Sequence, residues 1–141
     1  MTITISRADA ILSAARTLAA KLLLAIPIDR AALSEAMSEA SGGSDADGFW
    51  QQRDSFEALE AAVVLAVPEL IRGCDALAAI RALEALSREL PTHTVRSECQ
   101  IAFQQFSTPP ALAMLAVHLA QLSPDDVLLE PSAGTGILAM L

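Results

Sequence analysis

The sequence predicts a mostly helical chain whose last part begins an α/β fold. Hydrophobic residues make up 53% of the 141 residues and charged residues 18%, and tyrosine is absent, a composition typical of packed helices. Apolar residues recur at helical spacing as far as Leu90, whereas residues 127–129 form a short apolar run before a loop of small residues. We therefore expect an α-helical extension over 1–91 and the start of an α/β domain over 92–141.

The first two helices are marked by residues that cap helix N-termini. Ser6 with Asp9 three residues later approximates a capping box, and the helix that follows is expected to run towards Pro27. Asp29 is expected to cap a shorter second helix. That helix ends at residues 41–48, where glycine, serine and aspartate cluster, and we expect a flexible loop there.

Two further helices are expected before the end of the extension. The third includes residues 50–67, and Pro68 marks a kink or break because proline removes a backbone donor and clashes with the preceding turn. The fourth follows from Asp75 and continues to Leu90. The apolar residues that define these two helices are Trp50, Phe56, Leu59, Val63 and Val67, then Leu77, Ile80, Leu83, Leu86 and Leu90.

Pro91 and the polar connector 92–96 place the domain boundary. Ser97 with Gln100 forms a capping box that predicts a short helix ending near residue 105. Thr108 as N-cap and Pro109 at the first helical position then predict a new helix. One face of this helix carries Leu112, Leu115, Leu119 and Leu122.

A turn at residues 123–126 leads to the short apolar run 127–129, which we expect to be a buried parallel strand. The aspartates of this turn, Asp125 and Asp126, are expected to shape it and not to form a catalytic pair. The expected order in the last part of the chain is therefore helix, strand, glycine loop and the start of another helix.

The segment from Glu130 to Gly136 has features of a cofactor-binding loop. Gly134 and Gly136 permit backbone angles closed to other residues and a close approach to a ligand. Glu130 lies at the carboxyl end of the expected strand, where open parallel sheets bind ligands, and its carboxylate suits an ammonium or hydroxyl group. No Gly-Lys-Ser/Thr or three-glycine dinucleotide pattern is present. The glycines alone fit a purely structural turn equally well.

Two segments together resemble the paired cofactor motifs of adenine-N6 DNA methyltransferases. They are Gln104-Gln105-Phe106-Ser107-Thr108-Pro109 and Leu128-Leu129-Glu130-Pro131-Ser132-Ala133-Gly134-Thr135-Gly136. The resemblance implies a Rossmann-like fold that binds S-adenosyl-L-methionine. It implies that one side of the pocket for the methionine part is lined by Phe106, Ser107, Thr108 and Pro109. The other side would be formed by Glu130, Pro131, Ser132, Ala133, Gly134, Thr135 and Gly136.

The resemblance covers residues 97–141 and also extends to the methyltransferase-like front of bacterial strawberry-notch-type proteins, which continue into a helicase-like NTPase region. The chain lacks the second strand's acidic residue and the Asn/Asp-Pro-Pro-aromatic segment of the family, and Thr108-Pro109-Pro110 does not replace that segment. We therefore expect an N-terminal part, a truncated α/β domain that contributes cofactor motifs but no catalytic residue. The alternative is a non-catalytic scaffold attached to a helicase-like NTPase.

Charge limits the partners of this chain. The formal net charge of −8 and the pI near 4.5 describe an acidic surface that repels phosphate backbones. DNA is therefore expected to contact other regions of the complete protein. Cys74 and Cys99 lack a pairing motif and no signal peptide precedes them, so we expect reduced thiols in the cytoplasm. The apolar stretches are shorter than the ~20 residues that span a bilayer.

Other residues with possible chemical roles are better explained by structure. His118 is a candidate base, but a partly buried structural histidine is the favoured interpretation. His93, Cys99 and Cys74 lack the short spacing of a zinc site, so no metal is expected. Trp50 is expected to lie in the core or an interface, in preference to serving as a base-stacking platform.

Overall fold

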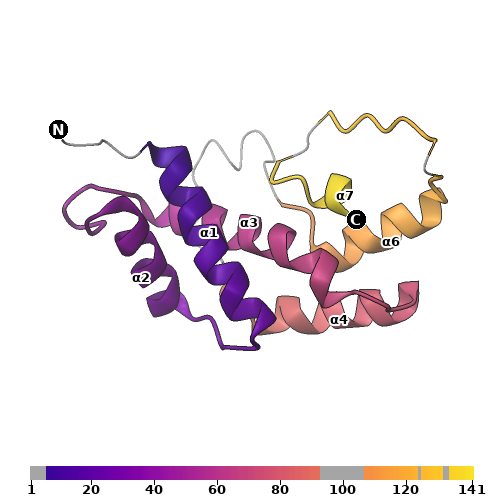
Figure 1. Ribbon diagram of the computed structural model, residues 1–141, viewed down its shortest axis with the longest axis horizontal. Coiled ribbons are helices and arrows are strands. Elements are labelled where there is room, and N and C mark those ends of the chain that lie inside the picture. The colour runs from indigo at the N-terminus through magenta and orange to yellow at the C-terminus, as the bar shows by residue number, and fades with distance from the viewer. Residues whose placement is uncertain (1–5, 93–106, 124, 132–133) are drawn as a thin grey trace. The chain divides into compact units, whose positions relative to one another are not determined.

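All regular elements of the described residues are helices, as the computed structural model shows in Figure 1. The structure describes residues 6–92, 107–123, 125–131 and 134–141. The helices are α1 (Arg7–Leu23), α2 (Arg30–Ser41), α3 (Gln52–Leu70), α4 (Ala76–Glu89), α6 (Pro110–Ala120) and α7 (Ile137–Met140). The predicted mostly helical class is confirmed. Among the described helices, none is long and apolar enough to cross a membrane.

The chain divides into two compact units, with the boundary inside α3. The first extends to Ala66 and includes Pro91, and the second holds Val67–Leu90 and the described residues from 107 onwards. Within the first unit, the Arg30 guanidinium donates to the Thr92 carbonyl at 3.2 Å. The domain boundary expected after Pro91 stays a prediction, because compact clusters of contacts are not the same as independent folding domains.

The first two helices begin where the sequence predicts. The Ser6 hydroxyl accepts a hydrogen bond from the Asp9 amide at 3.1 Å. The Asp29 carboxylate accepts one from the Ala32 amide at 2.8 Å. Each cap satisfies a backbone donor that the first turn of a helix leaves without an internal partner. Both predicted N-caps are confirmed.

Helix α1 ends before Pro27, through a turn that requires a left-handed residue. Ala25 has φ 54°, and the Ile26 amide donates to the Lys21 carbonyl at 2.9 Å. This is the six-residue bond of a Schellman motif, in which glycine usually occupies the left-handed position. An alanine there costs about 1 kcal/mol because its Cβ crowds the following carbonyl.

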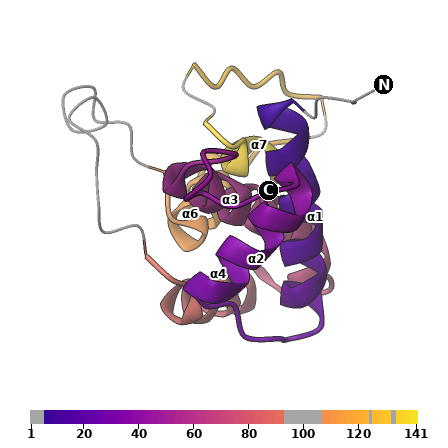
Figure 2. The same ribbon diagram turned by 90° about the vertical axis from the view of Figure 1, so that its left-hand side faces the viewer.

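Helices α1 and α2 lie side by side in both views of the ribbon (Figures 1 and 2). Small side chains on α1 let the two backbones approach closely, and aliphatic side chains fill the remaining space. At the edge, Lys21 Nζ lies 3.6 Å from a Glu35 carboxylate oxygen, an exposed pair worth little. The buried residues of the two helices are Ala10, Ala14, Ala15, Leu18, Ala19, Leu22, Leu33, Ala36 and Met37.

A buried carboxylate joins the start of α1 to the start of α3. Asp54 is only 1% exposed. One of its carboxylate oxygens accepts from the Gln51 amide at 2.9 Å, and the other accepts from Arg7, whose Nε lies 3.0 Å away. Because a buried charge is costly without partners, these bonds are needed to keep Asp54 buried where α3 begins.

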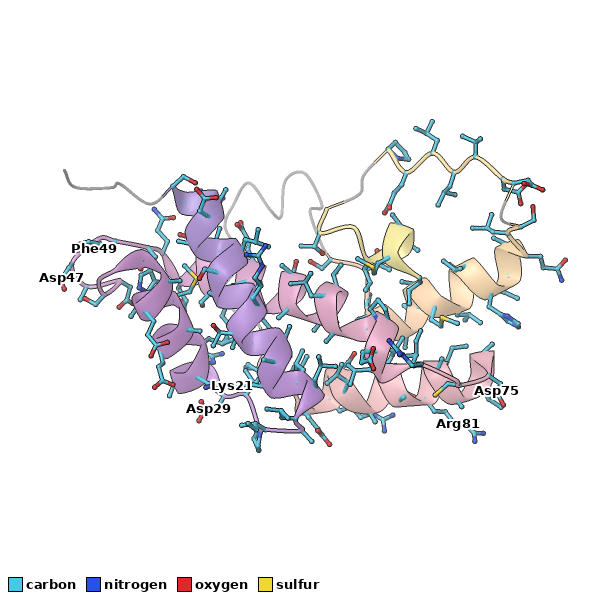
Figure 3. The ribbon with its side chains drawn as sticks, in the orientation of Figure 1. Lys21, Asp29, Asp47, Phe49, Asp75 and Arg81 are labelled. Atoms are coloured by element: carbon cyan, nitrogen blue, oxygen red, sulfur yellow. The ribbon has the colours of Figure 1, made fainter. Side chains whose placement is uncertain are left out.

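The loop between α2 and α3 is braced by its own hydrogen bonds. The Phe49 amide donates to the Ser44 carbonyl at 3.1 Å, and the Trp50 indole donates to the Gly43 carbonyl at 3.1 Å. A Cβ atom on Gly43 would overlap the Phe49 ring, which Figure 3 labels beside Asp47. The expected flexible loop is therefore a hydrogen-bonded one, and the buried Trp50 confirms the core interpretation.

Pro68 does not break α3, which continues to Leu70. Proline lacks the N–H that would bond to the carbonyl four residues earlier. In the last turn of a helix this loss affects few bonds, and α3 ends two residues after the proline. The break predicted at Pro68 is therefore not present.

The second unit is built on α4 and α6. The Asp75 carboxylate accepts from the Ala78 amide at 2.8 Å, which confirms the predicted start of α4; Figure 3 labels Asp75 there. Helix α6 packs against α4 on one side and against α7. Residues buried among these three helices are Ala79, Leu83, Ala113 and Ile137.

Helix α6 begins one residue later than predicted. Pro109 is the N-cap, with ψ 134°, and Pro110 occupies the first turn. A residue before proline is disfavoured in the α region, so Pro109 stays extended and Thr108 cannot serve as the cap. The missing N–H of Pro110 costs nothing at this position. The predicted cap at Thr108 is therefore wrong.

Residues 127–129 follow an extended path in Figure 1 but are not part of a sheet. Within the described ranges no residue forms a strand, because a strand requires a neighbour that shares its backbone hydrogen bonds. The strand expected at 127–129 is not present there. The short helix expected over 97–105 lies outside the described residues.

Candidate functional site

The glycine loop has the backbone that its sequence requires. Gly134 has φ 54° and Gly136 has φ 83°, both in the left-handed region that glycine adopts at little cost. Gly136 is the residue before α7, and no atom of the described residues lies within 4 Å of the position where its Cβ would be. A side chain at this position would therefore meet only backbone strain from the described residues. Ser132 and Ala133 lie outside the described residues.

One carboxylate oxygen of Glu130 lacks a hydrogen-bond partner within the described residues. This oxygen, Oε2, is buried. Buried polar atoms in folded proteins are nearly always hydrogen-bonded, and an unpaired one calls for an explanation. A carboxylate oxygen only accepts hydrogen bonds, so the missing group must be a donor, and a positively charged donor fits best.

The second predicted motif lies just before α6. Ser107, Thr108 and Pro109 are described and exposed, whereas Phe106 lies outside the described residues. Helix α6 follows this motif directly, and α7 follows Gly136. Because α6 and α7 are in contact, the structure brings together the helices that the two motifs precede. No hydrogen bond joins the two motifs within the described parts of the chain.

The turn before the extended segment is held by Asp126. Its carboxylate accepts from the Ser123 amide at 2.7 Å, and the Asp126 amide donates to the Ser123 carbonyl at 3.0 Å. The hydrogen bond from the Ser123 backbone, followed by one from its hydroxyl, lowers the pKa of Asp126 below its ordinary 3.8. Asp126 thus shapes this turn, as the sequence predicts.

The competing candidates do not assemble into a site. His118 is exposed on α6, so the prediction of a partly buried histidine is wrong. Cys74 is an exposed free thiol, and His93 and Cys99 lie outside the described residues. In the part of the chain that the structure describes, no three His, Cys, Asp or Glu side chains are grouped as metal ligands.

Across the described ranges, the candidate binding site is therefore Glu130, with its unpaired carboxylate oxygen, and the glycine backbone that follows it. The sequence motif identified both parts. The buried oxygen, however, is visible only in the structure, because burial depends on the whole fold. Comparison of the chain with models of protein families, with curated proteins and with solved structures found no match in any of the three.

Proposed function

We propose that this chain supplies part of the binding site for S-adenosyl-L-methionine in a methyltransferase of the DNA adenine-N6 type. The observation that carries the proposal is the buried Glu130 Oε2, for which the described part of the chain supplies no hydrogen-bond donor. S-adenosyl-L-methionine has an ammonium at its amino-acid end and hydroxyls on its ribose, and either supplies the donor that this oxygen lacks.

The glycine loop supports the same assignment. Gly134 and Gly136 have left-handed backbone, and the lack of a Cβ at these positions lets a ligand approach the main chain closely. The resemblance assigns the opposite wall of the pocket to Phe106–Pro109. The contact between α6 and α7 is compatible with that arrangement, because each helix starts where one motif ends.

The proposed role of these residues is to bind and orient the cofactor. When bound, S-adenosyl-L-methionine supplies an electrophilic sulfonium methyl group, which in this class is transferred to an adenine amino group. No catalytic residue is assigned to this chain. DNA contact is assigned to other parts of the complete protein because this chain carries a net charge of −8.

A titration followed by NMR tests the proposal. We expect S-adenosyl-L-methionine to shift the amide signals of Gly134, Thr135 and Gly136 in a saturable manner, with weak affinity in the range of about 0.1 to 1 mM. Glu130→Gln should weaken binding at least about tenfold, because it removes the charge of a charge-assisted hydrogen bond. Glu89→Gln on an exposed helix end is the matched control and should bind as the native chain does.

A second pair of variants tests the loop backbone. Gly134→Val should abolish the shifts, because a branched side chain fills the surface that the cofactor approaches. Gly73→Val is the control, since Gly73 is also left-handed, at φ 76°, with open space around it. Absence of any shift in the native chain at millimolar cofactor, or equal shifts in the Gly134→Val and native chains, would contradict the proposal.

A further inference from the structure

We draw no further inference here: the strongest candidate, the exposed apolar face of α6 that carries Leu112, Leu115 and Leu119, is an unpartnered surface, and nothing in the described part of the chain shows what covers it.

Discussion

The N-terminal helices and the C-terminal segment of this chain differ in how completely their polar groups are hydrogen-bonded. In the first unit, the caps at Ser6 and Asp29 are paired, and the buried carboxylate of Asp54 has two donors. In the second unit, the buried Glu130 Oε2 has no partner among the residues that the structure describes, and Leu112, Leu115 and Leu119 of α6 are exposed. The cofactor-binding role proposed for the second unit rests on this difference at Glu130.

The largest expected effect comes from breaking the buried ion pair of the first unit. Arg7→Ala removes a charged donor from the buried Asp54 carboxylate and should lower the free energy of unfolding by about 2 to 3 kcal/mol. Arg53, whose Nε lies 3.8 Å from the same oxygen, compensates only in part. The exposed pair of Arg88 with Glu84, at 2.6 Å, is the control. Arg88→Ala should cost less than about 0.5 kcal/mol. Urea unfolding followed by circular dichroism measures both, and equal losses would contradict a structural role for Asp54.

The next effect tests the braced loop. Gly43→Ala places a methyl group where the Phe49 ring lies, and should destabilise the chain by about 1 to 3 kcal/mol. Phe49 is exposed, so replacing it with alanine leaves no cavity in the core. The same substitution in a Phe49→Ala background should cost much less. Trp50 fluorescence during urea unfolding measures this cycle, and a full loss in both backgrounds would show that the overlap is not the cause.

A pair of opposite substitutions tests the helix ends of the first unit. Ala25→Gly should stabilise the chain by about 1 kcal/mol, because glycine adopts the left-handed backbone without a Cβ clash. Gly42→Ala should destabilise it by a similar amount, since Gly42 has φ 78° and no neighbour within 4 Å, which leaves backbone strain as the only cost. Thermal unfolding measures the change in stability of each variant. A change in the same direction for both variants would contradict the turn geometry.

The smallest effect concerns pH and the second unit. The folded-state pKa of Asp126 is lowered below 3.8, so its hydrogen bonds to Ser123 are fully present above that value and are lost as the pH falls through the lowered pKa. A carbon-13 NMR titration of the Asp126 carboxyl should have its midpoint below 3.8. Ser123→Ala should reduce this lowering only in part, because the backbone donor remains. A midpoint at or above 3.8 in the native chain would show that the turn is not formed in solution.

Local signals predicted the helix starts well. The caps at Ser6, Asp29 and Asp75 depend on a side chain and an amide three residues away, so the sequence contains all that is needed. The ion pair of Arg7 with Asp54 spans 47 residues, and no local pattern indicates it. The cap at Thr108 was misplaced because Pro110 restricts the residue before it.

Features that depend on distant partners were less predictable. The apolar run 127–129 predicts a strand, but strand formation requires a neighbouring strand, which the described residues do not provide. The leucine spacing of α6 predicts one apolar face without showing whether the fold covers it. For the candidate site, the motif identified Glu130 and the glycines, while the burial of one carboxylate oxygen emerged only from the structure.

Hydrogen–deuterium exchange with and without S-adenosyl-L-methionine tests the contrast between the two regions most directly. Exchange in α1 and α2 should be slow and unaffected by the cofactor, because their backbone amides are hydrogen-bonded within helices whose apolar residues are buried. Exchange of the amides at 134–136 should slow when the cofactor is present, and this slowing should be absent in Glu130→Gln. Slowing confined to the first unit, or no slowing at millimolar cofactor, would contradict the proposal that the unmet groups of the second unit form a cofactor site.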